Sequence, residues 1–352
     1  MAELEKLMGV SADDIEKIMG VAKADIEKVM GVEVVSMTSY QGNRAVAMGG
    51  YDTNEDRGST GSYATNRLDE IEYKAMASDG NTLLFGEIAS RPNVTDAAMT
   101  GSDTRAVAMG GYYNSDSEAT VRNDMDYITI ANTGNSTDFG DITVAREDGA
   151  GVGNGIRGVC CAGYTASAFS NVMDYITVGS TGNATDFGDA TRAVAPQGSA
   201  GNAHTTTGIF QMAYDGDYTN LDFNYITIAS TGNAGDFGDW SAAIASTAAI
   251  GLIESKSVWG GGYTSGGHGT WDSMEYVNPN STGNTTSQGD LGSAAHTSAG
   301  KFTNGTRGEM WGGGSNSHVN VQKLTIASSG DASHAGEVRE GARTNWDGWT
   351  GD

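Results

Sequence analysis

The side chains best suited to catalysis or metal binding are few and scattered along this sequence. No two of the five histidines have metal-ligand spacing: His204, His268, His296, His318 and His334. Zinc sites use ligands at short, regular spacings, so we expect no such metal. Asp215 and Asp217, or the acidic stretch 114–126, offer oxygen ligands for Ca²⁺, but neither completes an EF-hand loop. We therefore expect no cofactor, with Ca²⁺ as a weakly supported alternative.

The motifs that resemble parts of known enzymes are incomplete. Three Asp-Phe-Gly triplets match the kinase metal-binding triplet by letters, but no nucleotide loop, strand lysine or HRD motif accompanies them. The Tyr–Cys and copper ligands of copper-radical oxidases cannot be assembled, and STGNATDFGD lacks the tryptophan and the order of a sialidase Asp box. We assign the recurring arginines to structural ion pairs with aspartates: Arg44, Arg105, Arg157 and Arg307. The sequence thus predicts that the protein is not an enzyme.

Side chains suited to recognition gather in three variable segments, 52–69, 113–124 and 264–273. These segments are rich in Ser, Thr, Asn, Gly and Tyr, the residues that adaptable binding loops use. We predict that they are loops on one rim of the fold and that they carry any recognition. The candidate contact residues are Tyr63, Tyr113, His268 and Trp271. The alternative is that these loops are only solvated.

A phrase that occurs six times must build the scaffold for these loops. Residues 125–141 read MDYITIANTGNSTDFGD, and 173–189 and 223–239 are close copies. Weaker copies occupy 71–87, 274–290 and 322–337. Successive copies are 48–54 residues apart, which is typical of propellers and other repeat architectures.

Each repeat predicts four short strands. A variable stretch such as 148–155 forms the first strand, and an apolar run such as RAVAMGGY at 105–112 forms the second. MDYITI alternates and is rich in β-branched and aromatic residues, as a third strand requires. A Thr-Gly-Asn turn follows, because glycine adopts positive φ and asparagine tolerates it, and DFGD forms the fourth strand. Four strands in about 50 residues match a propeller blade.

We therefore predict an all-β fold with a six-bladed β-propeller at 33–352. The expected blades are 33–92, 93–146, 147–194, 195–246, 247–293 and 294–338, followed by a tail at 339–352. Val34–Gln41 is expected to supply the first strand of blade one, and the tail, with Trp346 and Trp349, to seal the junction or reach a neighbour. A β-sandwich array and a seventh, degenerate blade are the alternatives.

Composition excludes several partner classes. The net charge of −24, with 20 basic residues, argues against nucleic acid and anionic membranes. The sequence has no apolar run of 18 residues, so we expect no membrane insertion. The two cysteines, Cys160 and Cys161, are adjacent in a predicted strand and point to opposite faces. We expect them to be small core residues, in keeping with folding in a reducing cytoplasm.

Residues 1–32 contain a different repeat, of 11 residues: LEKLMGVSADD, IEKIMGVAKAD and IEKVMGV. One interpretation is a right-handed coiled coil, since 11 residues fill three helical turns. We favour short helices, because a glycine in every copy costs about 1 kcal/mol within a helix. Such short helices need a partner surface, so we predict a docking segment. Its apolar candidates are Leu4, Leu7, Met8, Ile15, Ile18, Met19, Ile26, Val29 and Met30.

The wording of the repeats resembles a known group of proteins. A glycine doublet, a tyrosine and an aromatic third strand are similar to a kelch repeat, although Phe stands where kelch blades usually carry Trp. DYITIxSTGNATDFGD behind RAVAMGGY resembles kelch-like repeat proteins in virions of tailed phages, especially marine cyanophages. The IEKVMGV copies are similar to short repeats that open phage structural proteins. The resemblance covers roughly residues 4–338 and implies a tail fibre, an appendage or a decoration protein.

From this resemblance we expect a non-enzymatic virion protein that is made in the host cytoplasm. Residues 1–32 would attach it to other virion proteins, and the protein would be present in several copies or as a homo-oligomer. The propeller would face outward, and its rim loops would bind a host-surface glycan. One alternative is a purely structural propeller in a tail or capsid lattice. Another is a carbohydrate-active enzyme, which requires convergent carboxylates or arginines at the propeller mouth.

Overall fold

The computed structural model describes twelve segments of the chain: residues 43–52, 69–89, 94–114, 119–197, 201–203, 205–216, 220–264, 271–294, 299–313, 319–339, 343–344 and 346–351. All of them belong to the unit that spans 39–352. The predicted helical repeats at 1–32, with their nine apolar candidates, lie outside the described residues. Within these segments, no helix has the length and apolar character needed to cross a membrane.

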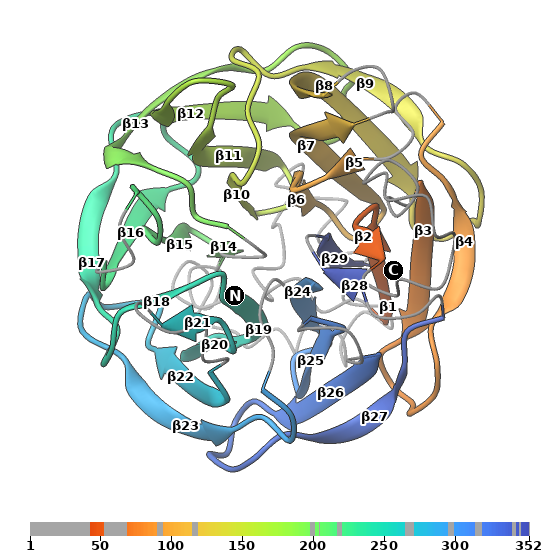
Figure 1. The fold of residues 1–352 in the computed structure, drawn as a ribbon, viewed down its shortest axis with the longest axis vertical. Helices are drawn as coiled ribbons and strands as arrows, with labels where there is room; N and C mark the ends of the chain where they lie inside the picture. Colours follow the sequence, from red (N-terminus) through yellow and green to blue (C-terminus); the bar gives the residue numbers. More distant parts are fainter. Residues whose placement is uncertain are drawn as a thin grey trace, which may run out of the picture. The chain divides into compact units, whose positions relative to one another are not determined.

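Six antiparallel sheets are arranged around a central axis, each with one short inner strand and one outer strand (Figure 1). This arrangement is a six-bladed β-propeller, so the predicted all-β fold and number of blades are confirmed. Each sheet uses the predicted strand order. The alternating burial of the third strands explains it, because one side of each strand packs into the core.

The blades contain the following strands, from the axis outward. Blade one has β29 (Asp347–Gly351), β1 (Arg44–Met48), β3 (Glu70–Ala75) and β4 (Leu83–Glu87). Blade two has β6 (Ala98–Gly101), β7 (Arg105–Asn114), β8 (Ala119–Thr129) and β9 (Thr137–Asp141). Blade three has β10 (Ala150–Gly153), β11 (Arg157–Tyr164), β12 (Phe169–Thr177) and β13 (Thr185–Val194).

Blade four has β14 (Gly201–Ala203), β15 (Thr207–Gln211), β16 (Asp222–Thr227) and β17 (Gly235–Asp239). Blade five has β19 (Ala248–Ile253), β20 (Lys256–Gly260), β22 (Ser273–Val277) and β23 (Thr286–Asp290). Blade six has β24 (Ala299–Thr303), β25 (Arg307–Trp311), β26 (Asn320–Thr325) and β27 (Ser333–Glu337). Five two-residue strands complete the fold: β2 (Tyr51–Asp52), β5 (Val94–Thr95), β18 (Ile244–Ala245), β21 (Tyr263–Thr264) and β28 (Arg343–Thr344).

The C-terminal strand β29 closes the ring. It pairs with β1 so that Trp349 lies opposite Val46, and β3 occupies the other edge of β1. The prediction that Val34–Gln41 supplies the first strand of blade one is therefore wrong, and the predicted sealing by the tail is confirmed. Burial gives the physical reason, because the tail brings Trp346 and Trp349 into the core with 1% and 5% of their surface exposed.

The repeat phrase holds neighbouring blades together. At the junction of blades two and three, the turn residue Gly182 donates its N–H to Phe139 O at 2.7 Å, and Ala184 donates to Asp141 O at 2.8 Å. The side chain of Asn183 accepts the N–H of Asp141 at 3.1 Å. We call these three contacts the inter-blade clasp. Equivalent clasps form at the turn glycines Gly80, Gly134, Gly232, Gly283 and Gly330.

Adjacent side chains in a strand serve two different core clusters. Cys160 packs with Met109 and Phe139 between blades two and three, and Cys161 packs with Phe187 between blades three and four. Both cysteines are buried and free. The prediction that they point to opposite faces as small core residues is confirmed.

The recurring arginines make structural contacts, but mostly not the predicted ones. Arg44, Arg105 and Arg157 each donate to a backbone carbonyl of the next blade at 2.8–3.1 Å, and each guanidinium lies over a tyrosine ring of its own blade. The predicted ion pair with an aspartate is therefore wrong for these three. Arg307 alone of the four forms one, with Asp79 at 2.8 Å.

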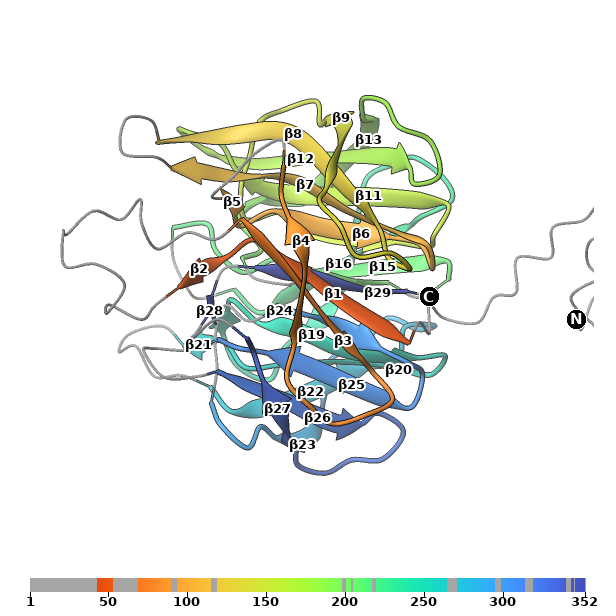
Figure 2. The same ribbon diagram turned by 90° about the vertical axis from the view of Figure 1, so that its right-hand side faces the viewer.

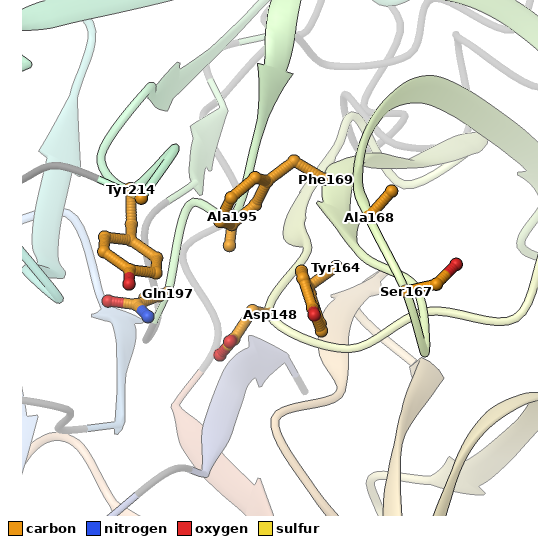
Figure 3. A pocket seen from close by; sticks show the side chains of 9 residues that line it. Asp148, Tyr164, Ser167, Ala168, Phe169, Ala195, Gln197 and Tyr214 are labelled. Atoms are coloured by element: carbon orange, nitrogen blue, oxygen red, sulfur yellow. The ribbon is translucent and has the colours of Figure 1, made fainter.

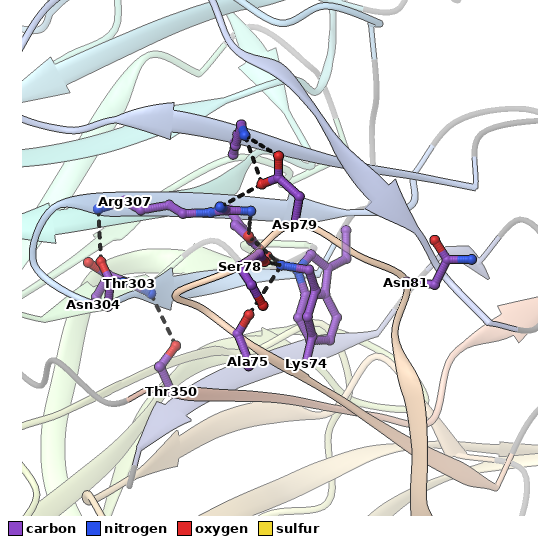
Figure 4. Close-up of polar contacts among 12 residues, drawn as sticks. Lys74, Ala75, Ser78, Asp79, Asn81, Thr303, Asn304, Arg307 and Thr350 are labelled. Carbon is purple, nitrogen blue, oxygen red and sulfur yellow. Dashed lines mark hydrogen bonds and ion pairs between the residues drawn. The ribbon is translucent and has the colours of Figure 1, made fainter.

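The seam between blades six and one carries a polar network (Figure 4). Lys74 and Glu309 form an ion pair at 2.8 Å, with side chains only 3% and 0% exposed. Arg307 bridges Asp79 and Glu309, and Lys323 also binds Asp79. Burial lowers the pKa of Lys74, whereas hydrogen bonds from Lys323 and Arg307 lower the pKa of Asp79. The two blades that join the ends of the ring are thus matched by charge as well as by the clasp.

Candidate functional site

A pocket of about 450 Å³ lies between blades three and four, on the face that carries the connections between second and third strands. Its walls are Tyr164, Phe169 and Tyr214, and Asp148 and Gln197 lie below them (Figure 3). The short strands β2, β5, β21 and β28 lie on this same side of the propeller (Figure 2). The described chain begins beside Arg44 and ends at Gly351, which pair with each other at the opposite face.

The three aromatic rings are held by backbone pairing. Tyr164 ends β11 and pairs with Phe169, the first residue of β12, across a turn in which Thr165 N donates to Ala168 O at 2.9 Å. Tyr214 exchanges two backbone hydrogen bonds with Ala195 at 2.7 and 3.1 Å. The Phe169 ring lies 5.2 Å from that of Tyr164 and 5.4 Å from that of Tyr214, both in edge-on geometry. These contacts make a row of three rings with Phe169 in the middle.

A β-bulge directs Tyr164 toward this row. The pairing of β11 with β12 shifts register between Cys161 and Gly163, and Ala162 has φ +57°. Such bulges change the direction of a strand and re-aim the side chains that follow. A Cβ on Gly163 would lie 2.6 Å from Glu147 O, so only glycine permits this approach.

The floor of the pocket belongs to a chain of hydrogen bonds that crosses four blades. Asp148 N donates to Asp96 O at 2.9 Å, and Gln197 N donates to Asp148 O at 3.2 Å. The Gln197 side chain then accepts the hydroxyl of Ser246 at 2.9 Å. All four residues have φ between +57° and +59°, a region that costs non-glycine residues energy and often marks functional sites. The floor is therefore rigid.

Carboxylates concentrate at this floor. Burial raises the pKa of Asp148 well above its ordinary value, and the carboxylates of Asp96 and Glu147 raise it further, in part through a hydrogen bond with Asp96. The aromatic walls and crowded acids together form a site that favours either a proton or a cationic group. In the described segments, no three His, Cys, Asp or Glu residues are placed to hold a metal ion.

The predicted recognition residues lie elsewhere. Tyr113 is half-buried in β7 of blade two, with the Arg122 guanidinium 5.8 Å from its ring centre. Trp271 packs against the buried cluster that contains Trp259, between blades four and five. Tyr63 and His268 lie outside the described residues. The structure does not bring Tyr113 or Trp271 into the pocket.

The pocket residues were not identified from the sequence. One usable signal was present, because Tyr164 and Tyr214 both end the apolar run of their repeat and therefore lie at the same level of adjacent blades. Phe169, Asp148 and Gln197 belong to no repeated motif, and nothing local marks them.

The buried acids of the repeat phrase have structural partners. Asp126 accepts the hydroxyl of Ser136 at 3.1 Å, and Asp174 pairs with Arg146 at 2.6 Å with both side chains fully buried. Glu275 accepts the hydroxyls of Ser241 and Thr285. These contacts explain why an acidic or amide residue recurs in the third strand.

No protein-family model matches this chain, and no curated protein sequence matches it. Functional inference therefore depends on the pocket and on the resemblance of the repeats.

Proposed function

We propose that this protein is a non-enzymatic display scaffold of a tailed-phage virion that binds a host-surface glycan through the face that carries the pocket. The observation that carries the binding role is the pocket itself, in which a row of three aromatic rings stands beside Asp148 and Gln197. Concave sites with aromatic walls and a few fixed polar groups are typical of small-molecule recognition. The volume of about 450 Å³ suits one or two sugar rings.

The arrangement of the two faces supports display. The pocket opens on one face, and the described chain leaves the propeller at Arg44 on the other. Attachment through residues 1–32 would then leave the pocket face exposed. The virion setting, the attachment to other virion proteins and the presence of several copies follow from the resemblance of the repeats. Several copies would strengthen weak glycan contacts through multivalency.

The two carboxyl groups near the pocket favour binding over glycoside hydrolysis. Retaining and inverting glycosidases hold their two carboxyl groups about 5–9.5 Å apart, so that the sugar and water fit between them. Asp96 and Asp148 instead interact through a hydrogen bond between their side chains. A pair in this arrangement cannot flank a glycosidic bond.

A glycan array of bacterial surface polysaccharides tests the binding role with the full chain. We expect specific glycans to bind, and Tyr214→Ala to abolish this binding while Leu83→Ala, at an exposed position of β4, has no effect. Failure of every glycan to bind, or equal binding by the Tyr214 variant, would contradict the role. Cryo-electron microscopy of the particle tests the setting. A propeller packed on both faces into a lattice would show a structural building block.

A further inference from the structure

We propose that the pocket between blades three and four selects a positively charged amino sugar over neutral sugars, with its ammonium group held between the aromatic row and the Asp148 carboxyl. This inference rests on the proposed glycan-binding role of the same face. It adds the chemical class of the sugar and a specific site for its charged group.

The aromatic row provides the first half of an ammonium site. Tyr164, Phe169 and Tyr214 line one cavity, and consecutive rings are 5.2 and 5.4 Å apart. Aromatic rings attract cations through their π-electron faces, and groups of rings around a pocket recognise ammonium groups. The same rings also accept the apolar face of a sugar, so they bind the whole ligand.

The carboxyl groups provide the second half. Asp148 lines the cavity, and it interacts with Asp96 and Glu147, both acidic. The groups that perturb Asp148 are all acidic, so no described lysine or arginine offsets the charge at this point. An ammonium group placed beside Asp148 would relieve this repulsion, whereas a neutral sugar hydroxyl would not.

The remaining polar groups fit a sugar. The Gln197 amide lines the cavity, and its oxygen is held by the Ser246 hydroxyl at 2.9 Å, so its orientation is fixed. Ser167 lies at the exposed side of the cavity and offers a hydroxyl. A net charge of −24 adds a long-range attraction for cationic ligands and repels anionic ones.

Three sugars of almost the same shape test the charge selection on the full chain. Glucosamine carries the ammonium group, and glucose and N-acetylglucosamine are its neutral counterparts. We expect saturation-transfer NMR and calorimetry, at a slightly acidic pH that keeps the amine protonated, to show about tenfold tighter binding of glucosamine. Tetramethylammonium serves as a separate probe of the aromatic row.

Two variants assign the selectivity to its residues. Asp148→Asn removes the carboxyl group, and asparagine tolerates the positive φ of this position. We expect this variant to bind the three sugars with equal affinity. Phe169→Leu removes the central ring and keeps an apolar side chain, so we expect it to weaken glucosamine and tetramethylammonium by about fivefold or more. Leu83→Ala is the control, and circular dichroism verifies that each variant is folded.

The outcomes separate this inference from the proposed function. If the three sugars bind equally and Phe169→Leu weakens all of them, the glycan role stands and the charge selection is overturned. If tetramethylammonium binds and no sugar does, an amino sugar is the wrong source of the ammonium group and the inference fails. If glycans bind to the array but none of these probes reaches the pocket, the inference fails while the glycan role survives.

Discussion

At the scale of single residues, the glycine of each DFGD motif is required by the inter-blade clasp. Gly188 has φ +140°, and a Cβ at this position would lie 2.4 Å from the backbone oxygen of Gly232 in the next blade. Backbone atoms cannot yield as a flexible side chain can. The kinase-like appearance of this triplet is therefore explained by packing between blades.

We predict that Gly188→Ala destabilises the protein by at least about 2 kcal/mol, through steric clash and backbone strain. Gly179→Ala is the matched control, because Gly179 lies in an exposed turn and nothing lies within 4 Å of its added Cβ. We expect the control to change the unfolding free energy by no more than about 0.5 kcal/mol in urea denaturation. Similar losses for the two variants would show that glycine entropy, and not the clasp, sets the cost.

Asp148 is expected to make the stability depend on pH. Its pKa is raised in the folded protein, so the protonated form contributes stability that is complete below the unfolded pKa of about 3.9. This contribution is lost as the pH rises through the folded pKa. We therefore predict that Asp148→Asn is more stable than the native protein at neutral pH, and that this gain shrinks at acid pH.

Urea unfolding of Asp148→Asn at several pH values measures this change. Asp186→Asn, at an exposed position of β13, is the control and should show a flat difference. A gain for Asp148→Asn that is constant across pH would contradict the assignment. A stabilised binding-site variant would fit the general observation that functional sites sacrifice stability.

At the scale of elements, β25 of blade six and β3 of blade one meet through a buried ion pair. Lys74 donates to Glu309, and the same glutamate accepts the indole N–H of Trp311 at 2.9 Å. Removal of one partner of a buried pair leaves the other charge without compensation. This seam is also the junction where the two ends of the ring meet.

We predict that Glu309→Ala lowers the unfolding free energy by about 3–5 kcal/mol, because Lys74 then remains buried without a partner. Lys323→Ala is the control at the same seam. Its ammonium group is partly exposed and pairs with the exposed Asp79, so we expect a loss of no more than about 1 kcal/mol. Thermal and urea unfolding compare the two. Equal effects would mean that the buried pair contributes no more than a surface contact.

At the scale of the whole molecule, the propeller is a closed ring that depends on one strand. β29 contributes Trp349, whose indole donates to Ser102 O in blade two at 3.0 Å. Asp347 accepts the N–H of Met99, also in blade two, at 2.8 Å. The C-terminal strand therefore binds the second blade as well as completing the first.

We predict that deletion of residues 346–352 destabilises the protein by at least about 5 kcal/mol, since it removes two buried tryptophans and exposes an edge of β1. A loss of this size equals the whole stability of many domains. Circular dichroism and size-exclusion chromatography should show unfolding or aggregation. A peptide of residues 343–352 should restore the fold, and a scrambled peptide should not. A truncated chain that melts within a few degrees of the native protein would disprove this closure.

The sequence by itself determined the number of blades and the strands within each repeat. Strand and turn signals such as MDYITI and Thr-Gly-Asn are local in the chain, and their sixfold recurrence reports the architecture directly. The opposite faces of Cys160 and Cys161 followed from strand alternation alone. Only the tertiary structure decided what depends on partners distant in the sequence.

Three such decisions involve contacts that no local pattern encodes. Ring closure chose β29 over Val34–Gln41, because two short β-forming segments near the chain ends compete for the same edge. The arginines bind backbone oxygens of the next blade, and backbone atoms carry no signature in the sequence. The pocket unites Asp148, Phe169 and Tyr214, which lie up to 66 residues apart and outside the common pattern of the repeats. The scaffold is periodic and therefore legible in the sequence, whereas the candidate site arises where the repeats differ and the fold brings those differences together.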